Sequence, residues 1–348
     1  MADRINRRIV MAARPEGAPR DGDFRLEETA VAEPGAGELL CRTLYLSLDP
    51  YMRGRMSAAK SYAARVELGE LMVGGAVSEV LRSKAEDFQP GDIVFAYSGW
   101  QDYWTAGAQG PRGIQGLRKV DPGIAPISTA LGVLGMPGMT AYTGLYNIGQ
   151  PRAGETLVVA AASGPVGSLV GQIAKIEGLR VVGVAGSAEK CAYVTGELGF
   201  DACLNHREAG FAAALAAACP DGIDIYWENV GGAVFEAVLP RLNRFARVPV
   251  CGLVAQYNLT EPPPGPDRIP QLMRAVLTDR LLIRGFIVWD FADQEAEFRD
   301  TVAGWLRGGR IKYREDVIDG LENAPRAFQG LLQGRNFGKQ IIRVAPER

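Results

Sequence analysis

The sequence predicts an α/β protein in which a doubly wound parallel sheet is joined to a second, mostly antiparallel β domain. Its 348 residues are too many for one compact core and suit two domains of about 100–200 residues each. Up to about residue 128 the chain consists of short β-like runs broken by Gly and Pro. After residue 128, buried strand patterns alternate with helical ones, as in a doubly wound sheet.

The β-like runs of the first part cover residues 38–45, 75–81 and 92–97. A Pro90-Gly91 pair precedes the third run and is typical of a reversing turn, because proline fixes φ and glycine frees it. Such spacing predicts a small antiparallel β domain.

The second part opens with a strand–helix–strand pattern. Residues 156–161 form a continuous apolar run, a helical pattern begins at Gly164, and residues 180–185 form a second buried run. Two strands joined by a helix must be parallel, with a right-handed crossover.

Further elements continue the alternation. Strands are predicted at 224–227, 247–251 and 281–288, and helices at 210–218, 233–239 and 293–306. We expect the last strand, at 340–344, to rejoin the β domain. The predicted domains are therefore 129–311 for the parallel sheet, and 1–128 with 312–348 for the β domain.

The turn between the first buried strand and its helix reads Ala162-Ser-Gly-Pro-Val-Gly167. This is the G-x-G-x-x-G dinucleotide fingerprint with Ala in the first place, and it predicts a Rossmann domain. One glycine lets the backbone approach a pyrophosphate, the other lets the helix lie close to the strand, and proline suits the first helical turn. The predicted pyrophosphate-binding residues are Gly164, Pro165, Val166 and Gly167.

The end of the second strand favours NADPH over NADH. Sites for NAD carry an Asp or Glu there, whereas this chain has Gly186-Ser187, with Lys190 shortly after. A lysine binds phosphate as a point charge. The alternative is that Lys190 only caps a solvent-exposed helix face and binds no phosphate.

Composition excludes several classes of function. The formal net charge is −2, and the Arg4, Arg7 and Arg8 cluster is better explained by a solvated strand than by nucleic-acid binding. The chain has no signal-peptide core and no apolar run of about 18 residues, so we expect a cytoplasmic protein that binds no membrane. Five cysteines without C-x-x-C spacing and one histidine, His206, predict no metal centre.

Several separated blocks of the sequence form one ordered set of motifs. The blocks are LSLDPYMRGRM at 46–56, YSGWQDY at 97–103, LGMPGMTAY at 134–142, residues 161–175, ENVGG at 228–232, GLENAP at 320–325 and NFGK at 336–339. Together they resemble the zinc-free medium-chain dehydrogenases/reductases that reduce conjugated double bonds. That group includes 2-alkenal, prostaglandin and leukotriene reductases and the bacterial NADPH-dependent curcumin reductases, to which the similarity is greatest.

The resemblance implies a GroES-like fold for the β domain and a set of NADPH-binding residues. It implies that Lys190 holds the 2′-phosphate, and that His206 stands where mammalian relatives have a tyrosine that reaches the same phosphate. Zinc enzymes of the superfamily have Gly-His-Glu where residues 73–77 read VGGAV, so no catalytic zinc is implied. The remaining residues implied to line the cofactor cleft are Asn229, Cys251, Gly252, Tyr257, Phe286, Ile287, Val288 and Asn336.

The implied reaction sends a hydride to the β-carbon of an enone and leaves an enolate, whose oxygen needs a hydrogen-bond donor. Tyr257 matches the family's tyrosine for this task, since a phenol with a pKa near ~10 is a suitable acid. The cofactor ribose hydroxyl is the competing donor. Tyr51 and Arg53 are candidates for the substrate side, the alternative being a turn in which Arg53 pairs with a surface carboxylate.

The implied function is therefore NADPH-dependent reduction of the C=C bond of α,β-unsaturated carbonyls such as curcumin-like enones and 2-alkenals. Two alternatives stay open, a zinc-free quinone reductase and a non-catalytic NADPH-binding protein. Relatives dimerise through the edge of the Rossmann sheet, so we expect a homodimer with 281–288 at that edge.

Overall fold

A computed structural model describes residues 4–108, 113, 116–263 and 265–347. The chain forms two compact units, one from Met1–Gly135 with Glu315–Arg348 and the other from Met136–Arg314. We propose that these units are the two predicted domains, whose boundaries at 128/129 and 311/312 lie a few residues earlier in the chain. Each unit is described by itself below.

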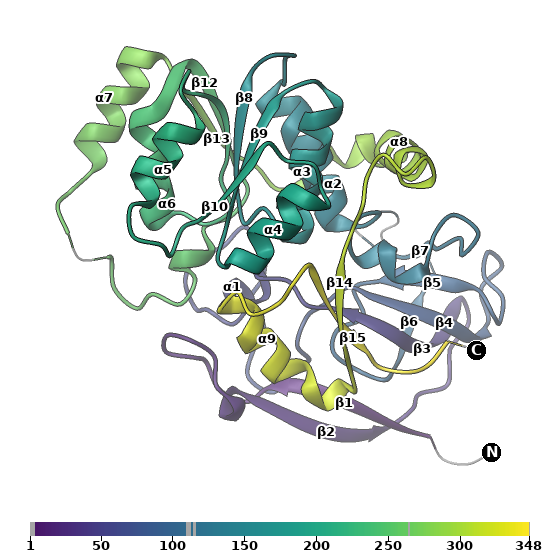
Figure 1. The fold of residues 1–348 in the computed structure, drawn as a ribbon. Coiled ribbons are helices and arrows are strands. Elements are labelled where there is room, and N and C mark those ends of the chain that lie inside the picture. The colour runs from purple at the N-terminus through teal and green to yellow at the C-terminus, as the bar shows by residue number, and fades with distance from the viewer. Residues whose placement is uncertain (1–3, 109–112, 114–115, 264, 348) are drawn as a thin grey trace. The chain divides into compact units, whose positions relative to one another are not determined.

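The first unit is built on a largely antiparallel sheet, as predicted. Its strand order is β14-β15-β3-β4-β5-β7, with β6 also paired to β3, so that strands from both ends of the chain lie side by side (Figure 1). The strands are β3 (Glu38–Ser47), β4 (Ala76–Ser83), β5 (Ile93–Ala96), β6 (Tyr103–Gly107), β7 (Arg118–Lys119), β14 (Glu315–Asp319) and β15 (Lys339–Arg343).

A separate two-stranded sheet and two short helices complete this unit. Strands β1 (Ile5–Met11) and β2 (Phe24–Ala30) pair antiparallel, and the helices are α1 (Met52–Arg55) and α9 (Ala324–Leu332). The Trp100 ring stacks on Phe24, with centroids 5.7 Å apart, and meets Phe328 of α9 edge-on at 5.8 Å. These contacts fix α9 against the β1–β2 pair through apolar burial.

The second unit is a six-stranded parallel sheet with the order β10-β9-β8-β11-β12-β13. The reversal of order after β8 makes it doubly wound, as predicted. Its strands are β8 (Thr156–Ala160), β9 (Arg180–Ala185), β10 (Ala202–Asn205), β11 (Ile223–Trp227), β12 (Leu242–Val250) and β13 (Leu282–Gly285).

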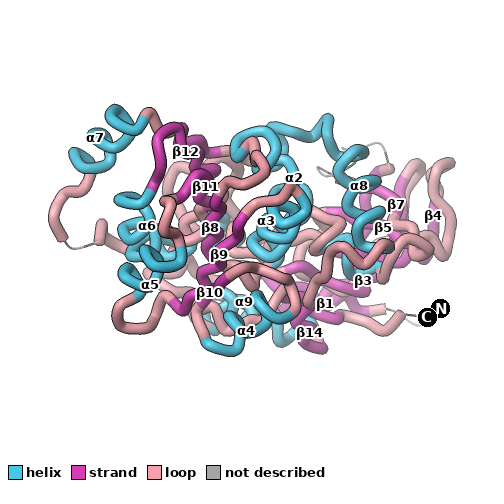
Figure 2. Tube along the Cα trace, turned by 45° about the horizontal axis from the view of Figure 1, so that its top comes forward, coloured by secondary structure: helices cyan, strands magenta, loops and turns pink. Residues whose placement is uncertain are grey.

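Helices cover both faces of this sheet. Figure 2 shows α2 and α3 on one side of the strands and α5, α6 and α7 on the other. Buried side chains of α5 and α6, such as Leu215 and Val238, pack on β8, β9 and β11. The helices are α2 (Met136–Gly144), α3 (Pro165–Ile176), α4 (Ala188–Gly196), α5 (Phe211–Ala218), α6 (Gly232–Val238), α7 (Ile269–Asp279) and α8 (Glu295–Arg307).

Two strands, β12 and β13, differ from their predicted bounds by three residues or more at one end. Strand β12 begins at Leu242, whereas the prediction began at 247. The first residues were missed because the strand is irregular there, with Phe245 in a left-handed conformation at a φ of 62°. Strand β13 ends at Gly285 instead of 288, since the backbone amide of Ile287 bonds to the Asp290 side chain at 2.9 Å and a 3-10 turn begins at Val288.

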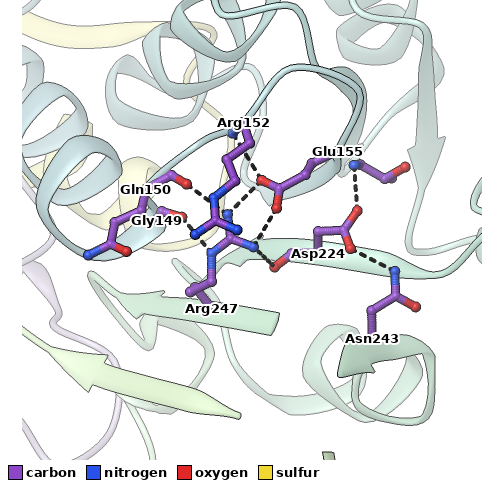
Figure 3. A network of polar contacts seen from close by, with 8 residues as sticks. Gly149, Gln150, Arg152, Glu155, Asp224, Asn243 and Arg247 are labelled. Atoms are coloured by element: carbon purple, nitrogen blue, oxygen red, sulfur yellow. Dashed lines mark hydrogen bonds and ion pairs between the residues drawn. The ribbon is translucent and has the colours of Figure 1, made fainter. Parts of the chain in front are cut away.

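An arginine network ties together the amino ends of β8, β11 and β12 (Figure 3). Both terminal nitrogens of Arg247 bond to the Glu155 carboxylate, at 2.8 and 2.6 Å, and its Nε donates to the Gly149 carbonyl at 2.8 Å. Asp224 accepts from the Thr156 amide at 2.8 Å. These polar groups thus bond to one another and to the backbone, whereas doubly wound sheets bind their ligands at the opposite, carboxyl ends of the strands.

Candidate functional site

The turn after β8 has the geometry of a phosphate-binding loop. Ala161 takes a left-handed φ of 53°, and Gly164 caps α3 with its amide bonded to the Ala161 carbonyl at 2.9 Å. No side chain caps this helix end, and Pro165 has no N–H. The amides of Val166 and Gly167 have no intrahelical acceptor, so they suit an anion at the helix start.

The two glycines of this turn are needed for different reasons. A Cβ on Gly167 would lie 2.4 Å from the Ala161 carbonyl oxygen and 3.1 Å from the Ala162 Cα, so only glycine lets α3 approach the strand end this closely. A Cβ on Gly164 would meet only the Ala161 oxygen, at 3.2 Å, within 4 Å. Gly164 is therefore not required by packing, and in the dinucleotide fingerprint a glycine at this place lets the backbone approach a pyrophosphate.

Lys190 lies at the start of α4, directly after β9. The Ser187 side chain caps this helix and accepts the Lys190 amide at 3.3 Å. The strand end consists of Ala185 and Gly186 and carries no carboxylate. Glu189 precedes Lys190 in the first turn of α4, whereas the strand end itself lacks the acid that NAD sites use to bind the ribose hydroxyls.

His206 lies beside this strand end. Its amide bonds to the Ala185 carbonyl at 3.1 Å, and its Nε2 lies 3.5 Å from the place of a Cβ on Gly186. Burial, with a further contribution from Arg207, lowers the pKa of His206. At neutral pH the imidazole is therefore neutral and can donate a hydrogen bond but adds no positive charge.

Arg207 is a residue that the sequence analysis did not select. Its Cζ and Nε also lie 3.5 Å from the place of a Cβ on Gly186. The pairing of β10 with β9, with Asn205 opposite Ala185, brings the residue after His206 to this position. Its nearness to His206 in the sequence was the only available indication.

Asn229, at the end of β11, joins two strand ends. Its amide nitrogen donates to the Ala160 carbonyl at 2.8 Å, and its oxygen accepts from the Trp227 indole at 3.1 Å. These bonds hold the carboxyl ends of β8 and β11 together. Asn229 thus shapes the edge on which the glycine turn lies.

Glu228 is a buried carboxylate next to Asn229, with 3% of its surface exposed. Its Oε1 accepts from the amides of Val230 and Gly231, at 2.6 and 2.7 Å, and from the Tyr226 hydroxyl at 3.1 Å. Burial raises its pKa, although these hydrogen bonds oppose the shift. The carboxylate fixes the turn in which Gly231 takes a left-handed φ of 77°.

The segment with Cys251, Gly252 and Tyr257 is held by the same turn. The amides of Cys251 and Gly252 bond to the Glu228 carbonyl, at 2.9 and 3.1 Å. A Cβ on Gly252 would lie 3.2 Å from the Tyr257 hydroxyl, so the half-buried phenol lies over this glycine. Burial, with a contribution from Glu228, raises the pKa of the Cys251 thiol to about 12, which keeps it protonated and unreactive.

Residues 286–288 follow β13 at the same edge. The Phe286 ring is buried and packs edge-on against Trp227, with centroids 5.9 Å apart, and near Phe291 at 6.0 Å. Its ring therefore belongs to the core of the unit. Any contact of Phe286 with a cofactor would involve its backbone, and Ile287 and Val288 continue the same segment.

The other three candidates, Tyr51, Arg53 and Asn336, lie in the first unit. The Arg53 guanidinium is buried and donates to the Gly17 carbonyl at 2.8 and 3.3 Å, so it anchors a loop. Burial and the nearby Tyr97 raise the pKa of Tyr51, which keeps its phenol protonated. The Asn336 side chain donates to the Gly338 carbonyl at 2.7 Å.

Other sequence features have plain structural roles. Arg7 pairs with Asp102 at 2.7 Å and Arg8 with Glu27 at 2.9 Å. Within the described ranges, no three His, Cys, Asp or Glu side chains are grouped so as to hold a metal ion. Across that same part of the chain, no helix has the length and apolar character needed to cross a membrane.

Comparisons with known proteins match both units. A family model described as the N-terminal domain of oxidoreductase matches residues 7–114, and one described as zinc-binding dehydrogenase matches residues 165–303. The chain is 58% identical to the NADPH-dependent curcumin reductase of Escherichia coli (strain K12), over 98% of this chain and 97% of that protein. It belongs to the medium-chain dehydrogenase/reductase family.

More distant relatives and solved structures give the same family. The NADP(+)-dependent 2-alkenal reductase of Nicotiana tabacum is 38% identical over 100% of both chains. The crystal structure of CurA in complex with NADPH from Vibrio vulnificus superposes with a TM-score of 0.93 at 51% identity, covering 98% of this chain and 100% of that one. The resemblance to the double-bond-reducing group of this family, with its Rossmann and GroES-like architecture, is thus confirmed.

Proposed function

We propose that this member of the medium-chain dehydrogenase/reductase family reduces the C=C bond of α,β-unsaturated carbonyl compounds with NADPH. The observation that carries the proposal is the carboxyl edge of the parallel sheet, where a glycine turn without a side-chain cap adjoins a strand end, Ala185-Gly186, that carries no carboxylate. Relatives named as NADPH-dependent curcumin reductase and 2-alkenal reductase support the reaction class. The substrates are curcumin-like enones and 2-alkenals.

The residues that would hold the cofactor lie along that edge. Gly164, Pro165, Val166 and Gly167 would receive the pyrophosphate on the helix amides. Lys190 and His206 would face the 2′-phosphate, as cation and neutral donor. The remaining cofactor contacts of this unit would come from Asn229, Cys251, Gly252, Tyr257, the backbone of Phe286, Ile287 and Val288. Asn336, in the first unit, stays a candidate on the resemblance alone.

Bound NADPH supplies a hydride, which reaches the β-carbon of the enone while the electrons of the C=C bond move toward the carbonyl oxygen. The chain must then stabilise the enolate oxygen and deliver one proton. Tyr257 is the proposed donor, because its hydroxyl lies beside Gly252 at the carboxyl edge. The cofactor ribose hydroxyl is the competing donor. No metal ion takes part in this scheme.

Tyr51 is the proposed substrate contact of the first unit. Its neutral phenol can donate to a carbonyl oxygen. Arg53 is a weaker candidate because its guanidinium already binds the Gly17 carbonyl. We propose that Arg53 shapes the Tyr51 turn by anchoring that loop.

The decisive assay is a substrate panel with curcumin, 2-nonenal and a quinone, in which NADPH oxidation is followed. Turnover of the two enones identifies an alkene reductase, turnover of the quinone alone a quinone reductase, and tight NADPH binding without turnover a non-catalytic protein.

Tyr257→Phe should lower kcat on an enone by about 10²–10⁴-fold. Tyr146→Phe, which loses a bond to Glu177, is the matched control, and full turnover by Tyr257→Phe would exclude that residue as donor.

We also propose a cytoplasmic homodimer. Strand β13 is an edge of the sheet, and α7 exposes Ile269, Met273 and Leu277 at helical spacing. An apolar stripe beside an open strand edge suits a second copy of the same surface. Light scattering should give twice the mass of the chain, and Met273→Glu with Leu277→Glu should halve it. Leu68→Glu, at an exposed site of the first unit, should leave the dimer intact.

A further inference from the structure

We infer that Arg207, together with Lys190, recognises the adenosine 2′-phosphate, and that Arg207 rather than His206 sets the preference for NADPH over NADH. The inference rests on the proposed function, since it assigns a specificity-determining residue to the same cofactor site. It departs from the resemblance, in which the residue at position 206 reaches the phosphate.

The Arg207 side chain lies beside the carboxyl end of β9. Strands β9 and β10 are parallel neighbours, and Asn205 pairs with Ala185. The residues after each strand therefore leave the sheet side by side. Because Gly186 has no side chain, the Arg207 guanidinium lies across the end of β9, with Cζ and Nε 3.5 Å from the place of a Cβ there.

Hydrogen bonds hold the backbone of Arg207 in place. The Asn205 side chain accepts the Arg207 amide at 3.1 Å and donates to the Glu208 carboxylate at 3.0 Å. The Glu208 amide in turn bonds to the Asn205 carbonyl at 3.1 Å. This turn fixes the direction in which residue 207 leaves the strand, and it directs the Glu208 carboxylate to Asn205.

Arg207 and His206 differ in charge at neutral pH. A guanidinium is always protonated and offers parallel N–H groups that match a phosphate, which makes it the strongest phosphate partner among side chains. His206 is half-buried and neutral at pH 7 because burial lowers its pKa. Of the two neighbours over Gly186, only Arg207 can offset the charge that distinguishes NADPH from NADH.

The experiment measures Kd for NADPH, NADH and 2′,5′-ADP by calorimetric titration of the full-length protein. Arg207→Gln should weaken NADPH and 2′,5′-ADP by about 10- to 100-fold, the range for a charged hydrogen bond, and leave NADH within about two-fold. Arg207→Lys should weaken NADPH binding less than Arg207→Gln does, because lysine keeps the positive charge but lacks the paired N–H donors of the guanidinium. His206→Gln should change the NADPH-to-NADH ratio less than Arg207→Gln does.

Arg244→Gln is the matched control, because Arg244 is an exposed arginine near the amino end of β12. It should change no Kd. The salt dependence of NADPH binding should also be shallower for Arg207→Gln than for the parent protein.

The outcomes separate the two proposals. If the parent protein binds NADH as tightly as NADPH, the proposed cofactor preference is wrong. If the parent protein prefers NADPH and Arg207→Gln keeps that preference, or weakens both cofactors equally, only the assignment of Arg207 is overturned. Should the Gln variant fail to fold, an unchanged NADPH affinity in Arg207→Lys would contradict the inference, since the paired donors are lost there.

Discussion

The Lys339 ammonium lies 2.7 Å from Oδ1 of Asp49 and 2.7 Å from the Leu48 carbonyl, with both charged side chains buried. The Ser47 hydroxyl donates to the other Asp49 oxygen. This pair joins the Asn336–Lys339 block to the Leu46–Met56 block, which were separate motifs in the sequence. It therefore holds the turn that carries Tyr51 against the carboxyl-terminal strand.

Lys339→Met should lower the free energy of unfolding of the first unit by about 3–5 kcal/mol, because it leaves the Asp49 carboxylate buried without its cation. Urea denaturation followed by tryptophan fluorescence checks this value. The control is Arg65→Met, which removes the exposed pair with Glu67 and should cost about 1 kcal/mol or less. Equal losses in the two variants would show that Asp49 is solvated or paired elsewhere.

The two glycines of the turn should respond differently to a methyl group. Gly167→Ala places a Cβ 2.4 Å from backbone, so α3 must shift, and we expect a loss of about 1–3 kcal/mol of stability. Gly164→Ala meets one oxygen at 3.2 Å and should cost less stability but weaken NADPH binding. Thermal denaturation and NADPH titration of both variants test this division. Two variants with the same pattern of losses would contradict it.

His206 is the only histidine of the chain, so its titration can be followed by NMR with isotope-labelled histidine. Its folded-state pKa should lie below the ordinary ~6.5, because burial disfavours the imidazolium. NADPH or 2′,5′-ADP should raise that pKa, since an added phosphate favours the charged form. A pKa that is unchanged by either ligand would remove His206 from the neighbourhood of the phosphate.

The same shift predicts a pH dependence of stability. The unfolded chain binds a proton at His206 more readily than the folded chain, so the stability contributed by the neutral imidazole is complete above the unfolded pKa of ~6.5. It is lost as pH falls from there through the lower folded pKa. As pH falls through that window, the unfolding free energy of the parent protein minus that of His206→Gln should decrease. An increase of this difference with falling pH would contradict the prediction.

Gly252→Ala should disturb Tyr257, because the added methyl would lie 3.2 Å from the hydroxyl. We expect kcat on an enone to fall, by less than in Tyr257→Phe. In the Tyr257→Phe background the same methyl should have little further effect, so a double-mutant cycle measures the coupling. Gly304→Ala, with open space around its place for a Cβ, is the control. Additive losses at 252 and 257 would mean that the two residues act independently.

Much of the fold was predictable because it depends on local periodicity. Buried runs and amphipathic helices identified β8, α3 and β9, and the glycine turn between them followed from its place in that pattern. Strand β10 was missed because it has four residues, Ala202–Asn205, and no distinct alternation. Helix α7 was missed because it follows a proline-rich stretch and leaves its apolar residues exposed.

The site was less predictable where it depends on contacts between distant segments. Arg207 becomes a candidate only when β10 is known to pair with β9, because that register places it over Gly186. The Lys339–Asp49 pair joins residues 290 positions apart, which no local pattern indicates. The sequence motif made Arg53 a candidate for substrate binding, whereas in the structure its guanidinium donates to the Gly17 carbonyl.

The position of β15 between β14 and β3 has a consequence for synthesis on the ribosome. Asp49 emerges 290 residues before Lys339, which at about 5–20 residues per second is a delay of roughly 15 to 60 seconds. All strands of the second unit lie between these two residues and can assemble during that interval. Strand β6 pairs with residues 38–42 of β3, but the Tyr45–Ser47 part of β3 gains its neighbour on that side only when β15 is synthesised. Until then the Asp49 carboxylate lacks its buried cation, so completion of the first sheet waits for the final segment of the chain.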